Sequence, residues 1–353
     1  MHKTGEVSGG VMSSNIYKVG GLFSGVGGIE LGFSLKDKFN IIWGTDIDEY
    51  ASKTYSLNFQ HRFIQQDINN LKGSELDHVD VLVGGFPCQA FSVAGYRKGF
   101  EDARGNIFFQ IIRLINELPS KPKVLMLENV KNLATHDNRR TFTIIQDQLE
   151  QSGYCVFSNI LNTCEYTSIP HNRERTFIVC FLEGKDAYMN PDMPMSATFK
   201  YLFPRNKLNQ VRPVKEFLEN RKVEEKHYYR ENKYNYKELV ESVTDSDTVY
   251  QWRRKYVRAN KSGVCPTLTA NMGTGGHNVP IIKDIYGIRR LTPRECFNLQ
   301  GFPAEYKLPD NVPMSQLYKQ AGNSVTVDMV REVAQVIHQC LENQENKEAA
   351  ITG

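Results

Sequence analysis

The segment IYKVGGLFSGVGGIELGF, residues 16–33, decides the fold because it reads as a strand, a glycine-rich turn and a helix in succession. Its glycines let the backbone turn tightly and approach a ligand closely. About twenty residues further on, after the apolar run 40–44, comes Asp46, where a carboxylate can accept hydrogen bonds from ribose hydroxyls. The unit suits any nucleoside-bearing cofactor, including NAD, FAD and S-adenosylmethionine. A plain tight turn would contain the same glycines.

The alternation of strand-like and helix-like segments continues to about residue 185. Strands are expected at 16–23, 40–44, 79–86, 123–130, 154–161 and 175–182, and helices at 28–35, 50–59, 106–118 and 139–152. Buried apolar runs with helices between them predict an α/β fold with a doubly wound, mainly parallel sheet.

The pattern breaks near residue 185, where stretches rich in Pro, Gly and small polar residues begin, and it becomes helical again over 325–341. We therefore expect a flexible tail at 1–15 and an α/β domain from residue 16 to about 185. A smaller domain with a hinge is expected at 186–321.

The composition is that of a soluble globular protein, with 40% hydrophobic and 24% charged residues. No apolar run approaches the roughly 20 residues needed to span a bilayer. The first residues lack the apolar core of a signal peptide. Seven scattered cysteines without a CxxC pair argue against disulfides or a zinc site and favour the reducing cytoplasm. No metal is expected.

Charge is unevenly distributed along the chain. Residues 200–262 contain sixteen Lys or Arg against nine Asp or Glu, giving +7, so the remainder sums to −4 within the total of +3. Seven tyrosines are interleaved with these charges. A basic, tyrosine-rich segment suits a polyanion such as nucleic acid, although a solvated helical face has the same composition.

A candidate nucleophile, Cys88, follows a predicted strand in the sequence GGFPCQ, residues 84–89. Parallel sheets bind ligands at the carboxyl ends of their strands, and nearby cations favour a thiolate there. A buried structural cysteine is the alternative. The following glycine-rich stretch contains Arg97, Lys98 and Arg104, which suits either a lid that meets phosphates or a solvated loop.

Two further charged sites border predicted strands. Glu128 ends a strand, where it could act as an acid or hydrogen-bond partner, or cap the following turn. Arg173 and Arg175 precede the run TFIVCF, and strand alternation places them on one side, facing one anionic site. A surface ion pair with Glu174 is the other interpretation.

Together, and in this order, these motifs resemble the cytosine-C5 DNA methyltransferase family of bacterial restriction-modification type. The resemblance rests on FSGVGG, GGFPCQAFS, ENV, HNRER, RRLTPRECFNLQGFP (289–303) and YKQAGNSVTVDMV (318–330). It covers nearly the whole chain apart from the amino-terminal tail and residues 185–260. Six ordered motifs are far more specific than any one of them.

The resemblance implies roles for individual residues. Cys88 is expected as the nucleophile, Glu128 as the contact to cytosine N3 and the amino group, and Arg175, supported by Arg173, as the contact to the base oxygen. The expected contacts to S-adenosylmethionine are Phe23, Gly25, Val26, Gly28, Asp46, Ile47, Asp67, Ile68, Pro87, Ile107, Asn323 and Val325. The expected DNA contacts are Gln89, Ser92, Arg97, Lys98, Thr267, Thr269 and Asn271.

The reaction implied is methylation of carbon 5 of a flipped-out cytosine in a short specific site of double-stranded DNA. The resemblance implies that residues 322–343 fold back onto residues 16–185 and complete a Rossmann-like catalytic and cofactor-binding domain. The smaller domain would be the target-recognition domain, and its stretch 264–280 resembles readers of CCGG or CCNGG sites. A monomer in the bacterial cytoplasm, at the nucleoid, is expected. A cognate restriction endonuclease would act on the same site without direct contact.

Three rival functions remain from the sequence. An RNA methyltransferase of the same fold would usually carry a Thr-containing variant beside its nucleophile, where this chain has CQAFS. A catalytically dead DNA-binding regulator does not need Cys88, Glu128 and Arg175 together. A nicotinamide oxidoreductase leaves Pro87-Cys88 and Arg173–Arg175 unexplained.

Overall fold

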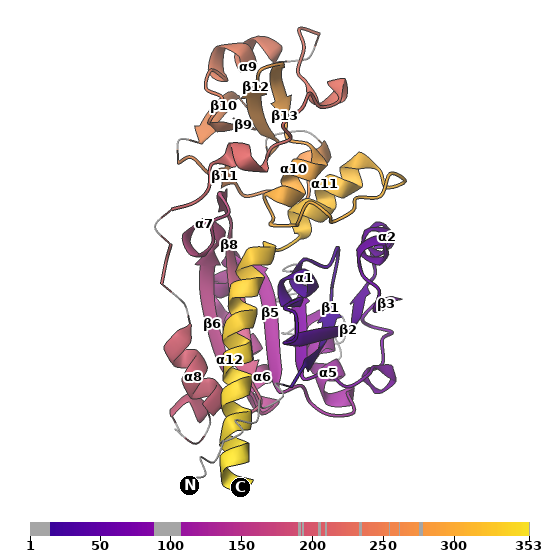
Figure 1. Ribbon diagram of the computed structural model, residues 1–353, viewed down its shortest axis with the longest axis vertical. Coiled ribbons are helices and arrows are strands. Elements are labelled where there is room, and N and C mark those ends of the chain that lie inside the picture. Colours follow the sequence, from indigo (N-terminus) through magenta and orange to yellow (C-terminus); the bar gives the residue numbers. More distant parts are fainter. Residues whose placement is uncertain are drawn as a thin grey trace, which may run out of the picture.

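A seven-stranded sheet forms the larger part of the molecule, with strand order β3-β2-β1-β4-β5-β8-β6 (Figure 1). The computed structural model describes residues 15–87, 107–189, 192, 194–203, 206–208, 210–232, 235–253, 255–260, 262–274 and 278–352. The strands are β1 Tyr17–Leu22, β2 Phe39–Asp46, β3 Arg62–Gln65, β4 Val81–Gly85, β5 Val124–Val130, β6 Cys155–Asn162 and β8 Glu174–Phe181.

Strands β1 to β5 run parallel, and β8 runs antiparallel between β5 and β6. The predicted doubly wound, mainly parallel α/β fold is therefore confirmed. The short strand β3 was not among the strands predicted from apolar runs. Its residues are only partly buried, so its sequence contains no continuous apolar run.

Helices cover both faces of this sheet. Alternate residues of each strand point to opposite faces, so Val81 and Val124 pack with α1 and α12, whereas Leu82 and Leu125 pack with α5 and α6. The helices of the larger part are α1 Gly28–Phe33, α2 Glu49–Asn58, α5 Ile107–Glu117, α6 Arg140–Gln151, α7 Thr163–Tyr166, α8 Pro194–Leu202 and α12 Val327–Thr352.

A second sheet of four strands, in the order β10-β9-β12-β13, lies at the opposite end of the molecule from the end of α12 (Figure 1). It has its own small apolar cluster, in which Leu239 of α9 packs on Tyr250 and Ile281. The elements are α9 Tyr236–Ser242, β9 Val249–Arg253, β10 Tyr256–Asn260, β12 Pro280–Asp284 and β13 Gly287–Arg290.

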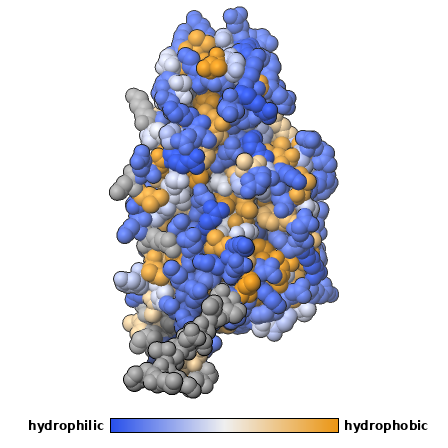
Figure 2. Space-filling view, viewed as in Figure 1, coloured by the Kyte–Doolittle hydropathy of each residue, from blue (hydrophilic) through white to orange (hydrophobic). Residues whose placement is uncertain are grey.

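Between the two sheets lie the helices α10, Pro293–Asn298, and α11, Met314–Asn323 (Figure 1). Their apolar cluster joins Phe297 and Tyr318 to Val26 and Ala51 of the larger part. A two-stranded ladder, β7 His171–Asn172 with β11 Cys265–Pro266, adds a second connection. Figure 2 shows hydrophobic patches interspersed with a mostly hydrophilic surface on this face.

Short 3₁₀ helices complete the described elements. They are η1 Gly73–Glu75, η3 Lys131–Ala134, η4 His136–Arg139, η5 Ala187–Met189, η6 Val214–Phe217, η7 Glu225–His227 and η8 Met272–Thr274.

Helix α12 extends beyond the segment 325–341 that the apolar period predicted. Its first part is buried on the sheet, and its last residues are mainly exposed. That part, residues 342–352, contains three Glu, two Ala and one Lys, which are residue types of high helix propensity. Within the described residues, no helix is both long enough and apolar enough to cross a lipid bilayer.

The first helix, α1, buries a carboxyl group. Glu30 is fully buried, and a Cβ atom on Gly21 of β1 would lie 2.1 Å from its Oε1. Burial raises the pKa of Glu30 to about 7 from the ordinary 4.5. The folded state thus binds this proton more tightly than the unfolded chain. Protonated Glu30 therefore contributes to the free energy of unfolding. This contribution is fully present below about pH 4.5 and is lost as the pH rises through 7.

Substitution Glu30→Gln keeps a neutral side chain of similar shape at every pH and removes this dependence. We expect its free energy of unfolding, relative to the wild type, to rise by about 3 kcal/mol between pH 4.5 and pH 8, because one pKa unit corresponds to about 1.4 kcal/mol. Urea unfolding across this pH range measures the difference. Glu49→Gln, at an exposed position in the first turn of α2, is the control. If the free energy of unfolding of Glu30→Gln differs from that of the wild type by the same amount at every pH, the raised pKa of Glu30 is contradicted.

Candidate active site

A pocket of about 690 Å³ opens at the carboxyl ends of β1, β2, β4 and β5. In the sheet order, β1 lies between β2 and β4, so the connections from these strands diverge to opposite sides. Such a switch point is where open α/β sheets bind ligands. The pocket is closed on the far side by the end of α11 and the residues after it, Lys319 to Val325.

The residues predicted as cofactor contacts all line this pocket. They are Phe23, Gly25, Val26, Gly28, Asp46, Ile47, Asp67, Ile68, Pro87, Ile107, Asn323 and Val325. Glu128, Arg173 and Arg175 border the same pocket. Segments more than 250 residues apart in the sequence thus meet in one cavity.

The glycine-rich turn after β1 is held by the carboxylate of Asp46. Asp46 Oδ2 accepts the backbone N–H of Gly25 at 2.7 Å, and its Oδ1 accepts that of Asp48 at 2.9 Å. Burial raises the pKa of Asp46. Each carboxylate oxygen has a second lone pair that remains able to accept from a ligand hydroxyl. Asp46 can therefore shape the turn and bind a ribose at once.

Backbone conformation in the same turn is unusual. Gly27, the residue before α1, has φ 77°, and Phe23 has φ 54°. Glycine adopts such angles freely, but a bulky side chain does so at a cost of about 1–3 kcal/mol. The surrounding contacts hold Phe23 in this conformation at the edge of the pocket, a pattern that is typical of ligand sites.

A mostly buried ion pair lies deeper in the site. Arg175 Nε is 3.0 Å from Glu128 Oε1, and the two side chains are only 14% and 12% exposed. Val130 is the direct cross-strand partner of Arg175, so Glu128 lies diagonally across from it on the same face of the sheet. Burial raises the pKa of Glu128 above its ordinary value, although Arg175 and Arg173 oppose this. A carboxyl of this kind can hold a proton nearer to neutral pH.

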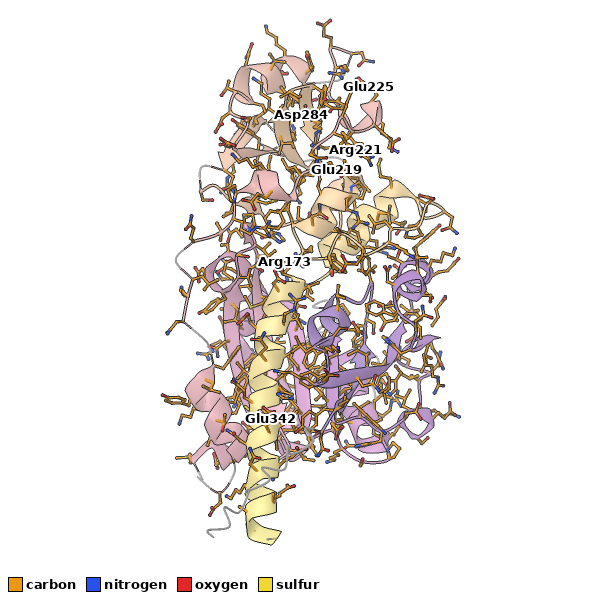
Figure 3. The ribbon with its side chains drawn as sticks, viewed as in Figure 1. Arg173, Glu219, Arg221, Glu225, Asp284 and Glu342 are labelled. Atoms are coloured by element: carbon orange, nitrogen blue, oxygen red, sulfur yellow. The ribbon has the colours of Figure 1, made fainter. Side chains whose placement is uncertain are left out.

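Arg173, although it borders the pocket, does not bond to Glu128 as Arg175 does. Its guanidinium donates to the backbone oxygens of Leu268, Gly322 and Ser324. In Figure 3 it lies at the junction of the larger sheet and the upper part of the molecule. The two arginines therefore face the same cavity with different partners.

The predicted nucleophile, Cys88, lies outside the described residues, as do Gln89, Ser92, Arg97 and Lys98. The chain leading to Cys88 is described as far as Pro87, which lines the pocket. Asn129 Nδ2 donates to the carbonyl oxygen of Phe86 at 2.8 Å and fixes this approach beside β5.

The predicted DNA contacts Thr267, Thr269 and Asn271 do not line the pocket. Thr267 Oγ1 donates to the carbonyl oxygen of Asn172 at 2.7 Å, and Thr269 Oγ1 donates to Asn271 Oδ1, also at 2.7 Å. Asn271 is exposed. The structure thus brings Thr269 and Asn271 together and turns the Thr267 hydroxyl towards the larger part.

Three pocket residues on α11, namely Lys319, Gln320 and Gly322, were not predicted from the sequence. Lys319 Nζ is 2.7 Å from Asp48 Oδ2, and Gln320 Oε1 accepts the hydroxyl of Thr54 at 3.0 Å. These contacts tie α11 to α2 across the cavity. Gln320 lies three residues before Asn323, so helical periodicity around Asn323 was a signal that could have identified it.

Sequence comparison matches this chain to a known family. The family described as C-5 cytosine-specific DNA methylase matches residues 17–339. The chain is 47% identical over 327 residues to the Type II methyltransferase M.Bsp6I of Bacillus sp. (strain RFL6), covering 92% of this chain and 99% of that protein. It is 36% identical over 332 residues to the Type II methyltransferase M.NgoBI of Neisseria gonorrhoeae, covering 94% and 96%.

Solved structures share the fold at lower sequence identity. The Entamoeba histolytica methyltransferase EhMeth matches with a TM-score of 0.70 at 18% identity, covering 93% of this chain and 99% of that one. The S. pombe Dnmt2 methyltransferase matches with a TM-score of 0.67 at 18% identity, covering 92% and 99%. At these identities the two structures support the fold alone.

Breaking the ion pair at the base of the pocket should destabilise the protein. We expect Glu128→Ala to lower the free energy of unfolding by about 3 kcal/mol, the low end for a buried pair because both side chains border an open cavity. The double variant Glu128→Leu/Arg175→Met should lose less than the sum of Glu128→Leu and Arg175→Met. Chemical denaturation of the four proteins completes the cycle. Strictly additive losses would show that the two charges are not coupled.

Proposed function

The chain belongs to the C-5 cytosine-specific DNA methylase family, and we propose that it methylates a cytosine flipped out of a short specific duplex site. Membership makes it a DNA cytosine-C5 methyltransferase of Type II restriction-modification kind. The proposal adds the roles of individual residues, the flipped base and the readout of sequence. A single observation carries it: the Glu128–Arg175 pair, Pro87 and the predicted cofactor contacts all border one cavity.

The pocket fits S-adenosylmethionine by its chemistry. Asp46 offers free lone pairs to a ribose, and Ile47, 63% exposed, offers an apolar surface to an adenine ring. Gln320 lines the cavity, and its buried Nε2 has no hydrogen-bond partner among the described residues. When bound, S-adenosylmethionine supplies the electrophilic methyl group.

The residues of the chain then activate the base. The Cys88 thiolate forms a bond to carbon 6 of cytosine, and Glu128 protonates N3 so that negative charge does not accumulate on the ring. Arg175 holds the base oxygen. Its ion pair with Glu128 also orients the Glu128 carboxyl group. Carbon 5 becomes nucleophilic and would accept the methyl group, with S-adenosylhomocysteine as the leaving group. Loss of the carbon-5 proton to water, return of the N3 proton to Glu128 and expulsion of the Cys88 thiolate from carbon 6 restore the aromatic ring.

DNA engagement would use both parts of the molecule. Residues 16–185 with 322–343 would catalyse, and residues 186–321 would recognise the target, apart from α8, which packs on α12 in the larger part. Flipping a cytosine costs a few kcal/mol, which contacts to phosphates and grooves offset. The protein would act as a monomer in the bacterial cytoplasm, and a restriction endonuclease would cleave the same site.

Methyl transfer and its covalent step test the proposal directly. With tritiated S-adenosylmethionine, label should enter DNA and not RNA, and Cys88→Ala should abolish transfer while S-adenosylhomocysteine still binds. DNA containing 5-fluorocytosine should give an adduct that survives denaturing gels, since fluorine cannot leave as the proton does. Cys164→Ala, at a half-buried cysteine outside the pocket, is the matched control. Transfer by Cys88→Ala, or an adduct on another residue, would refute the mechanism.

Variants of the 264–274 stretch and of the basic segment should affect DNA binding in different ways. Thr269→Ala and Asn271→Ala should change the preference among sites in a randomised duplex library, because each base-edge contact discriminates by about 1–3 kcal/mol. Arg258→Ala, at an exposed position of β10 in the basic segment, should instead weaken binding to all sequences and flatten its salt dependence by about one unit. The same library tests the expected CCGG or CCNGG preference. An unchanged profile in both loop variants would remove the loop from the readout.

A further inference from the structure

Strand β11 of the smaller part pairs with β7, the short strand that precedes β8. Cys265 and Pro266 pair in parallel with His171 and Asn172, and the N–H of Cys265 donates to the carbonyl of Pro170 at 2.7 Å. The stretch that continues from this ladder, residues 264–274, is called the 264–274 loop here. It contains none of the residues that line the cofactor pocket.

The peptide groups of Leu268 are bound on both sides by buried side chains. Its N–H donates to His171 Nε2 at 3.1 Å, and its carbonyl accepts from Arg173 Nη1 at 3.0 Å. His171 and Arg173 are 0% and 2% exposed. Burial lowers the pKa of His171 well below its ordinary value, so the ring is neutral and able to accept. Leu268 is therefore fixed relative to the start of β8.

The same guanidinium reaches the wall of the cofactor pocket. Arg173 Nη2 donates to the carbonyl of Gly322 at 3.2 Å and to that of Ser324. Gly322 lies directly against the 264–274 loop, because a Cβ atom on it would come within 2.2 Å of the Thr269 carbonyl carbon. Gly322 to Val325 line the pocket. One buried charge thus bonds both the loop and the pocket wall.

A buried guanidinium cannot lose its acceptors without cost, since each unmet donor retains its desolvation penalty. The carbonyls of Leu268, Gly322 and Ser324 must consequently keep their positions relative to one another. We propose that Arg173 is a positioning residue that transmits occupation of the cofactor pocket to the 264–274 loop, so that the bound cofactor orders the segment predicted to read DNA. The inference rests on the proposed function for the identity of the cofactor.

Hydrogen–deuterium exchange of the full chain, with and without saturating S-adenosylhomocysteine, tests this without DNA. In the wild type, the ligand should slow exchange both in peptides from 44–52, which line the pocket, and in peptides from 264–274. We expect a ratio on the order of fivefold or more in the loop. In Arg173→Lys, which cannot span three carbonyls as the planar fork does, the loop ratio should fall to about one while 44–52 stays protected.

A different result is expected if Arg173 only holds the 264–274 loop in place and does not transmit ligand binding. Its loss would speed loop exchange equally with and without ligand and leave the ratio unchanged, which would overturn the proposal. The proposal would also be overturned if, in the wild type, the ligand slows exchange in 44–52 but does not change exchange in the 264–274 loop. If 44–52 shows no protection in the wild type, the assigned cofactor has failed instead.

Two further variants complete the design. Arg113→Lys is the matched control, because Arg113 also donates to two backbone carbonyls, those of Ile68 and Leu71, but away from the loop. It should keep the loop ratio of the wild type. If Arg173→Lys does not fold, Gly322→Ala replaces it: the added methyl displaces the loop from the pocket wall while Arg173 remains, and an unchanged ratio there would count against the proposal.

Discussion

Strand β1 hydrogen-bonds to β2 on one side and to β4 on the other, and the placement of the active site depends on this pairing. Leu22 lies opposite Gly84, so the glycine-rich turn after β1 opens beside the segment that leads to Cys88. On the other side, β2 ends at Asp46, whose carboxylate holds that turn. Backbone pairing alone therefore brings the proposed cofactor and nucleophile regions to one edge.

Charges are buried in this protein where segments distant in sequence meet. Glu128 and Arg175 join β5 to β8, and Arg173 joins β8 to α11 and the 264–274 loop. In the smaller part, Arg289 is 1% exposed between Asp284 and Glu295, which are near it in sequence. Glu295 also accepts the backbone N–H of Glu219, 76 residues away, and closes the capping box of α10. Such groups are costly to desolvate and demand fixed partners. Each of them therefore constrains the relative position of the segments that it joins.

Much of the larger part could be predicted from sequence because its signals are local. Apolar runs of strand length gave the sheet, and the glycines with Asp46 located the pocket. Ordered motifs also predicted that Asn323 and Val325 return to the pocket from the end of the chain, as the structure finds.

What the sequence could not supply was the direction of particular side chains. Strand alternation placed Arg173 and Arg175 together, but the hydrogen bonds of Arg173 depend on carbonyls 95 to 151 residues away. Likewise, Gln320 and Lys319 become pocket residues only because α11 packs across from α2. The length of α12 was underestimated because its last residues are helical by propensity, without an apolar face to mark them.

The long helix α12 also returns the chain to the beginning of β1. Glu345 Oε1 accepts a hydrogen bond from the side chain of Asn15, at 2.8 Å, just before β1. The residues that precede β1 and the last part of α12 are thus neighbours at the face of the molecule far from the pocket. A short peptide joining them, with a new opening in an exposed connection elsewhere, would leave the sheet and the pocket intact. The linear order of the motifs is accordingly one of several circular permutations that this architecture can accommodate.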